Sequence, residues 1–272
     1  MKEFGYSKKH LIEDQASIRY HAVRDEFFAW LKKELPRFQQ GRGLLITGGE
    51  PFLDDDFYQL FDKINVKDTR IHINTNLNTP KKFWTRQTQL LEKLISQGNK
   101  LVLRCSIDGV GQQQEWQRQN SHWDLQAANW LRLGSMPIQM FCSLTVTPLT
   151  LESMCGAGQW LIDTAPRLAK KPAWIKSSMV TWPRHFDASE WFSLFKPEIQ
   201  QMQSLIVNPA LLSGEWGLGS QIRSWLASTA RPSDLTREKL RAELDIAEHT
   251  YGGGSWRELY PKLANMLGTR GG

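Results

Sequence analysis

A Gly-Gly-Glu-Pro motif at residues 48–51 follows a short apolar run and joins two flexible backbone positions to one carboxylate. Gly48 and Gly49 let the backbone approach a ligand closely, which makes their peptide groups available as hydrogen-bond partners. The Glu50 carboxylate is suited to bind a cation or an amine. The alternative interpretation of this motif is a tight turn that carries a solvated glutamate.

Polar side chains also follow the next two apolar runs of the chain. Asn74 and Asn76 fall on one side of a strand, and their amides offer donors and acceptors to a carboxylate or a sugar hydroxyl. Ser106 and Asp108 are suited to hold ribose hydroxyls or to orient a substrate. The alternative for the second pair is a plain turn, since Asp-Gly is among the commonest turn dipeptides.

A fourth polar segment lies just before a predicted helix. It combines carboxylates, a cation and aromatic rings, contributed by Glu115, Trp116, Arg118, Trp123 and Asp124. The alternative interpretation is a helix entrance, because a carboxylate in the first turn of a helix interacts favourably with the helix dipole.

Several other types of catalytic or metal site are excluded because the sequence lacks the motifs that they require. The six histidines form no HExxH pair, which argues against a zinc hydrolase. No GxSxG nucleophile elbow, Walker loop or strand-linked GxGxxG occurs. The three cysteines, Cys105, Cys142 and Cys155, match no compact metal motif, and they are expected to be small buried residues. No metal ligand is therefore predicted in this chain.

The elements that must position these motifs alternate along the chain. Apolar runs rich in β-branched residues predict strands at 44–47, 71–75, 101–107, 138–146, 174–180 and 204–207. Helical patterns between them cover 17–35, 55–64, 80–97 (with Thr79 as N-cap) and 123–133. This order predicts an α/β fold with a parallel sheet, and the continuous apolar runs predict strands buried on both faces. An open doubly wound sheet and a full or partial barrel both fit.

Ligands of parallel α/β proteins bind at the carboxyl ends of the strands. The motifs sit at predicted strand ends, so we expect Glu50, Asn74, Asn76, Ser106 and Asp108 to converge on one mouth of the sheet. The alternation of apolar runs and helical patterns ends near residue 211, where a glycine-rich stretch begins. We therefore predict two parts, a barrel-like body over 1–210 and a loop-rich, helical C-terminal appendage over 211–272.

Composition narrows the class of protein further. The 272 residues carry a net charge of +6 and a pI near 9.2, which permits an anionic partner without requiring one. Nucleic acid is not the expected partner, since the Trp182–His185 segment fits a packed loop with solvated charges. No apolar run reaches the ~18–20 residues of a membrane span, and the polar N-terminus predicts a cytoplasmic protein.

Taken together and in order, the motifs resemble those of radical S-adenosylmethionine (radical SAM) enzymes, and most closely the twitch-domain radical SAM proteins. The matching segments are Gly48-Gly49-Glu50-Pro51, Asn74–Leu77, Ser106–Gly111, Glu115–Arg118 with Trp123, Asp124 and Asn129, and the closing Ser255–Leu263. Trp116 stands where that family has tyrosine. The likeness covers about residues 44–267.

The resemblance implies a partial (β/α)6 TIM-like barrel whose [4Fe–4S] cluster cleaves SAM to a 5′-deoxyadenosyl radical. By resemblance, Gly48, Gly49 and Glu50 hold the methionine amine. Asn74, Asn76, Ser106 and Asp108 line its carboxylate and ribose side. No catalytic residue and no substrate are implied for this chain.

The sequence departs from the family pattern in one respect, and this departure leaves more than one possible function. The Cys-x3-Cys-x2-Cys cluster motif is missing, and no strand is predicted before residue 44, so the barrel is expected to lack its first strand. The chain is then the body of an enzyme completed by an upstream segment or a separate polypeptide. One alternative is a non-catalytic SAM-binding module or degenerate fragment without iron–sulfur chemistry. The other is an unrelated α/β protein in which the motifs occur by chance.

Overall fold

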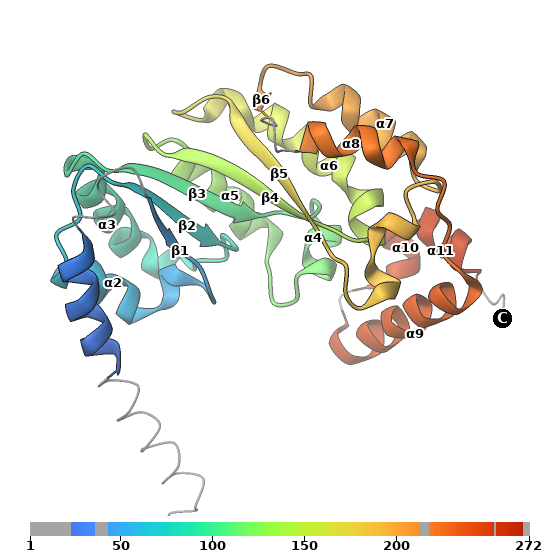
Figure 1. Cartoon of the computed structure of the whole chain (residues 1–272), viewed down its shortest axis with the longest axis horizontal. Coiled ribbons are helices and arrows are strands. Elements are labelled where there is room, and N and C mark those ends of the chain that lie inside the picture. The colour runs from blue at the N-terminus through green and yellow to red at the C-terminus, as the bar shows by residue number, and fades with distance from the viewer. Residues whose placement is uncertain (1–22, 36–42, 213–217, 253, 269–272) are drawn as a thin grey trace, which may run out of the picture.

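The structure, a computed structural model, describes residues 23–35, 43–212, 218–252 and 254–268 (Figure 1). It is a mixed α/β fold built on one six-stranded sheet, and the order of the strands in the sheet equals their order in the chain. Every neighbouring pair of strands is parallel, which confirms the predicted α/β class. The strands are β1 (Leu44–Ile46), β2 (Arg70–Thr75), β3 (Lys100–Ser106), β4 (Gln139–Val146), β5 (Ala173–Met179) and β6 (Leu211–Leu212).

Helices connect successive strands, as parallel pairing requires. A helix over residues 23–35 precedes β1. The next connections contain η1 (Pro51–Leu53), α2 (Asp55–Lys63), η2 (Lys81–Phe83), α3 (Trp84–Ser96), α4 (Gln112–Gln117) and α5 (Trp123–Gly134). Then follow α6 (Pro148–Thr164), η3 (Ala165–Arg167), η4 (Arg184–Phe186), η5 (Ala188–Glu190) and α7 (Lys196–Leu205). The C-terminal helices are α8 (Leu218–Ala227), α9 (Asp234–Tyr251), α10 (Trp256–Leu259) and α11 (Pro261–Leu267).

Local sequence explains where several of these helices begin. The Asp54 side chain accepts a hydrogen bond from the Asp56 N–H and caps α2. Thr147 caps α6 in the same way, and Pro148 occupies the first helical position, where it has no missing hydrogen bond. Ser233 caps α9. These starts follow from residues within four positions of one another, so they are set locally.

The side chains of the strands alternate between a buried face and a half-exposed face. Ile71, Leu103 and Cys142 belong to the buried face, which α3, α5 and α6 cover from one side (Figure 1). The other side, here called the open face, carries Leu45, His72, Asn74, Val102, Arg104, Ser106, Gln139, Phe141, Ser143, Thr145, Trp174, Lys176 and Ser178. The prediction of burial on both faces is therefore wrong for the described residues, because the helices among them that cover the sheet lie on one side.

Two element predictions are also wrong. Residues 204–205 are the end of α7 and residues 206–207 form a turn, while the sixth strand is Leu211–Leu212 instead. Thr79 is not the cap of the third helix, which starts as the 3-10 turn η2 after Pro80. Thr79 is fully buried, and its carbonyl accepts hydrogen bonds from Trp84 Nε1 and Asn129 Nδ2. The predicted helix start at residue 17 lies outside the described residues.

The C-terminal helices pack onto the body of the molecule. Trp256, Tyr260 and Leu263 are buried in the same hydrophobic cluster as the strands. The Tyr260 hydroxyl donates to the Gln113 carbonyl at 2.9 Å, so α10 and α11 lie beside α4 and α6 (Figure 1). The predicted division at residue 210 stays a prediction. Within the described residues, no helix combines the length and the apolar character needed to cross a bilayer.

Replacing Asn99 by alanine tests the link between the first two helical connections. The buried Asn99 amide donates to the carbonyls of Val66 and Leu94 at 2.9 Å and accepts from the Thr69 N–H at 3.0 Å. We expect Asn99→Ala to lower the free energy of unfolding by about 2–4 kcal/mol, because the Val66 carbonyl and the Thr69 N–H lose their partner, while the Leu94 carbonyl keeps the backbone N–H of residue 99. Urea denaturation measures this. The matched variant Asn65→Ala, at an exposed position, should stay within about 0.5 kcal/mol of the parent, and equal losses in both would contradict the assignment.

Candidate functional site

The parallel sheet brings the predicted motifs to one edge, the carboxyl edge. Glu50 follows β1, Asn76 follows β2, Asp108 follows β3 and Thr147 follows β4. They divide into two neighbouring groups, one around Glu50 and one around Asp108. The loop after β2 joins the groups, because the Asn78 side chain bonds the backbone of residues 120 and 122, which line the second group's cavity.

Glu50 lies in a cage of hydrogen-bond donors. Its carboxylate accepts from the Thr75 hydroxyl at 2.8 Å, from the Asn76 N–H at 2.8 Å and from the Phe52 N–H at 3.4 Å. Burial raises the pKa of Glu50, although these donors act in the opposite direction. The described residues supply no cation that pairs with Glu50. Its negative charge is thus desolvated and held in place without a counter-ion.

Gly48 and Gly49 form the turn before Glu50. Their φ angles of 112° and 31° lie in the left-handed region that favours glycine. A Cβ at either position would meet no atom within 4 Å, so their peptides border open space. This space is a cavity of about 570 Å³ that Glu50 also lines, together with Phe27 and Phe28 from the helix over residues 23–35.

The other members of the first group differ in what they leave free. The Asn74 amide nitrogen donates to the Thr47 hydroxyl at 2.9 Å, while its buried Oδ1 has no partner among the described residues. Asn76 holds its own loop, since its Oδ1 accepts from the Asn78 N–H at 2.8 Å. Ser106 lies on the open face, half-buried, and pairs in register with Ser143 of β4. Ser106 therefore keeps its hydroxyl available to a ligand, whereas the unpartnered oxygen of Asn74 is buried.

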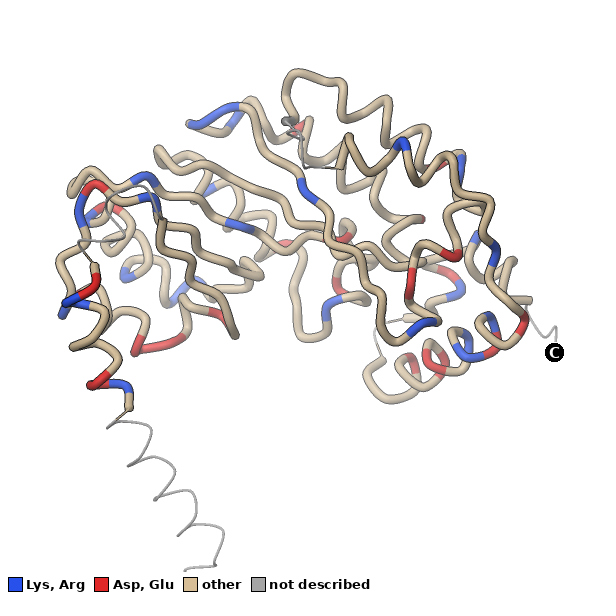
Figure 2. Tube along the Cα trace, in the orientation of Figure 1, with Lys and Arg blue, Asp and Glu red and all other residues tan. Residues whose placement is uncertain are grey.

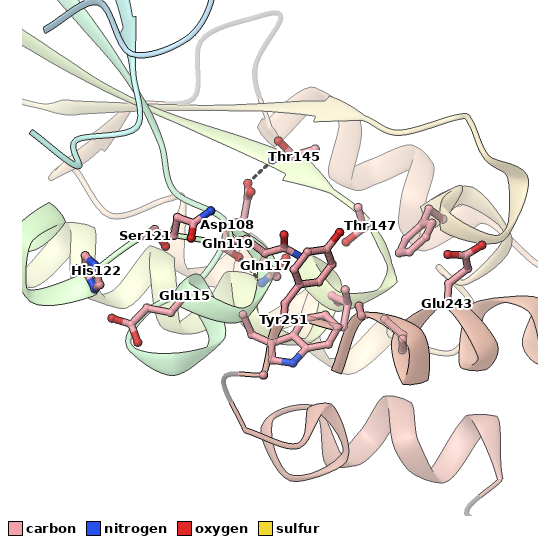
Figure 3. Close-up of a pocket in the computed structure, with 17 residues that line it drawn as sticks. Asp108, Glu115, Gln117, Gln119, Ser121, His122, Thr145, Thr147, Glu243 and Tyr251 are labelled. Carbon is pink, nitrogen blue, oxygen red and sulfur yellow. Dashed lines mark hydrogen bonds between the residues drawn. The ribbon is translucent and has the colours of Figure 1, made fainter. Parts of the chain in front are cut away.

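Asp108 is the buried centre of the second group. One carboxylate oxygen lies 2.8 Å from Arg118 Nε. The other accepts from the Thr145 N–H at 2.6 Å, as Figure 3 shows. Burial raises the pKa of Asp108, while Arg118 and the Thr145 N–H oppose that shift. The Arg118 guanidinium also donates to the Thr145 hydroxyl at 3.2 Å. Both oxygens of Asp108 are thus engaged within the protein.

Two glutamines of α4 orient this group. Sequence reasoning did not identify Gln114, and it gave no role to Gln117, which lies within the fourth polar segment. The fully buried Gln114 accepts from the Asp108 and Gly109 N–H groups and donates to the Ser106 carbonyl at 3.1 Å. Gln117 donates to the Asp108 carbonyl and to the Ser153 hydroxyl. The available signal was the polar run at 112–115 (Gln-Gln-Gln-Glu) directly after the strand-end motif at 106–111.

A cavity of about 520 Å³ opens beside Asp108 (Figure 3). Its polar walls come from the segment around α4, including Glu115 and Gln119, and from Thr147 at the end of β4. The far wall is α9, which presents Glu243 and Tyr251. The predicted appendage therefore closes one side of this cavity.

The fourth sequence segment has mainly positioning roles. Glu115 accepts from the Trp123 N–H at 2.7 Å and satisfies the start of α5. The fully buried Asn129 donates to the carbonyls of Leu77 and Thr79 at 2.9 Å. It thereby holds the loop that carries Asn76. The helix-entrance interpretation applies to Asp124, which lies in the first turn of α5.

The three cysteines do not form a cluster-binding set. Cys105 and Cys142 are register partners on the buried face, and burial raises the pKa of both thiols. Cys155 lies in α6, where burial raises its pKa to about 11 and its thiol donates to the Glu198 carbonyl. No three Cys, His, Asp or Glu residues in the described ranges are grouped to hold a metal ion. The prediction that this chain alone assembles no cluster stays a prediction.

No family model, curated protein or solved structure matches this chain significantly. The chemistry offered to a ligand is therefore inferred from the site itself. Within the described residues, the carboxyl edge presents a caged carboxylate that pairs with no cation and an amide oxygen that accepts from no donor, together with two glycines at positive φ and a buried carboxylate–guanidinium pair.

Replacing Arg118 by methionine tests the buried pair. Asp108 already has a raised pKa in the folded protein, so its contribution to stability is greatest at low pH and is lost as pH rises through the folded value. Removing the cation raises that pKa further. We expect Arg118→Met to lower the free energy of unfolding by about 2 kcal/mol near pH 7 and by less than half of that near pH 4, as urea denaturation measures.

The exposed pair between Lys93 and Asp62 provides the control. Lys93→Met should cost under about 1 kcal/mol at both pH values, because solvent screens the pair. A loss in Arg118→Met that is the same at both pH values would show that the guanidinium does not act on Asp108.

Proposed function

We propose that this chain binds S-adenosylmethionine at the carboxyl edge of its sheet, as the body of a radical SAM enzyme with a partial (β/α)6 barrel. The order of the motifs supports this proposal, because three of them follow the consecutive parallel strands β1, β2 and β3, and the fourth lies in the connection from β3 to β4. The placement of Glu50, Asn76 and Asp108 on one edge supports it further, since a ligand bound along this edge spans neighbouring strand ends.

The observation that carries the proposal is the charge of Glu50. Desolvating a carboxylate costs free energy unless a cation pairs with it, and no described cation does so. An ammonium group fits such a place, because a charge-assisted hydrogen bond in a partly dry site is stronger than one in water. The amino group of SAM supplies this ammonium.

The other polar groups of the carboxyl edge suit the other parts of SAM. The peptide groups of Gly48 and Gly49 border the open space beside Glu50 and provide backbone partners. The half-buried hydroxyl of Ser106 suits a ribose hydroxyl, and the buried Oδ1 of Asn74 lacks a donor among the described residues. Asp108, whose oxygens are engaged, acts by orienting Arg118, and its role is indirect.

The iron–sulfur cluster is the group that the thiols present do not fit. When bound, such a cluster supplies the electron that cleaves SAM. We propose that a segment carrying the cysteine triplet completes the enzyme, in the same polypeptide or as a partner. The second candidate is a SAM-binding module without iron–sulfur chemistry, with which the burial of Cys105 and Cys142 is equally compatible.

Replacing Glu50 by glutamine tests SAM binding. Glutamine keeps the size of the side chain and removes the charge that would pair with the ammonium. We expect Glu50→Gln to weaken SAM binding by about ten- to a hundredfold, the value of one charge-assisted hydrogen bond, as isothermal titration calorimetry measures. The same variant should unfold at an equal or higher urea concentration, because it no longer buries an unpaired charge.

The control is Glu92→Gln on the exposed surface of α3, which should bind SAM like the parent. If Glu50→Gln binds SAM as tightly as the parent, the ammonium does not lie at Glu50. If the parent does not bind SAM at all, the proposed function is wrong.

Anaerobic reconstitution with iron and sulfide separates the enzyme from the module. We expect this chain alone to take up no stoichiometric cluster, because three thiolates must converge on a cluster. Cys105 and Cys142 are buried side by side on neighbouring strands, and Cys155 lies in a helix, α6. A version extended by a segment with the cysteine triplet should gain both the cluster and 5′-deoxyadenosine formation. A cluster in the unextended chain that is lost in Cys105→Ala or Cys155→Ala would contradict this expectation.

A further inference from the structure

The strands of the sheet carry positive charge and no carboxylate. Their charged residues are Arg70, Lys100, Arg104 and Lys176, and Figure 2 shows blue segments but no red along the strands. Arg104 and Lys176 lie on the open face, while Arg70 and Lys100 begin β2 and β3. None of the four forms an ion pair with another residue of the described ranges. The charge on this side of the sheet is thus uncompensated there.

Two aromatic rings lie beside these cations on the open face. Phe141 and Trp174 are register partners, with ring centroids 6.1 Å apart and an interplanar angle of 17°. Both side chains are half-buried, so part of each ring remains accessible. The Arg104 guanidinium lies 5.7 Å from the centroid of Phe141. The rings therefore form a flat apolar platform with positive charge at its side.

A cavity of about 550 Å³ lies over this platform, toward the amino ends of the strands. Its lining includes Arg70, His72, Lys100, Phe141, Lys170 and Trp174. Its volume falls in the range of small-molecule pockets. The lining reaches His72 and Phe141 within the strands, but none of its residues lines the cavities beside Glu50 or Asp108, so it is not part of those two groups.

The positive charges near the cavity affect the neighbouring ionisable groups. Burial lowers the pKa of His72, and the charges of Arg104 and Arg70 lower it further. Arg104 Nε is buried and has no hydrogen-bond acceptor among the described residues. An anion at this place would reduce the repulsion among the cations and supply acceptors, which gives the site a preference for negative charge.

We propose that this cavity binds a free nucleotide, with the phosphates among Arg70, Lys100 and Lys170 and the base on Phe141 and Trp174. Aromatic side chains bind bases of any identity by stacking, and cations bind phosphate. A free nucleotide is favoured over a nucleic acid strand because the cations and the rings surround one cavity. The proposal stands on different residues from the SAM site and does not depend on it.

Calorimetric titration with GTP tests the site, since its base differs from the adenine of SAM. We expect Arg70→Gln combined with Lys100→Gln to weaken GTP binding at least tenfold. Both side chains are exposed, so the double variant should fold. Trp174→Leu should weaken binding at least fivefold through lost stacking. Guanosine and tripolyphosphate should each bind more weakly than GTP.

The matched control removes the same charge elsewhere. Lys32→Gln with Lys33→Gln, on the helix over residues 23–35, should bind GTP within twofold of the parent. Glu50→Gln should also bind GTP within twofold, so that failure of one proposed site can be distinguished from failure of the other. GTP affinity unchanged in both the Arg70/Lys100 variant and Trp174→Leu would overturn the proposal. Tighter binding of a ten-nucleotide thymidine strand than of GTP would overturn the assignment to a free nucleotide.

Discussion

Burial of one face of a parallel sheet determines where the chemistry of this protein lies. Leu103 and Cys105 are fully buried beneath the helices, and because side chains alternate, Arg104 between them must lie on the open face. Parallel pairing in chain order also places every strand end at one edge. The same packing therefore creates both a polar edge for Glu50 and Asp108 and a half-exposed face with cations.

Polar groups at the carboxyl edge are buried at a cost that the surrounding structure largely offsets. Gln114 satisfies the backbone around Asp108, and Asn129 satisfies the loop after β2. Glu50 differs, because its hydrogen bonds are complete but its charge is not paired within the described residues. An unpaired charge of this kind is typical of a binding site, where stability is lower in the absence of the ligand.

The sheet separates charges of opposite sign. Glu50 and Asp108 lie at its carboxyl edge, whereas Arg70, Lys100 and Arg104 lie toward the amino ends or on the open face. Arg70 and Lys100 begin their strands, and Arg104 projects from the open face; in the part of the chain that the structure describes, none of these cations forms an ion pair with Glu50 or Asp108. The first set suits a ligand with an amine, and the second suits a ligand with phosphates. One layer of secondary structure thus presents two chemically distinct surfaces.

The sequence was sufficient to predict five of the six strands and their parallel order. It also predicted that Glu50, Asn76 and Asp108 lie at strand ends. These features depend on the spacing of apolar residues, on glycines and on helix caps, all of which act within a few residues. The run at 204–207 could not be distinguished from a helix end, since four residues of this kind fit both. Three features become visible only once the elements are packed: one face of the sheet is open, Arg118 pairs with Asp108, and α4 contacts the end of β3 through Gln114. These contacts depend on which elements come to face one another, and local periodicity carries no information on that.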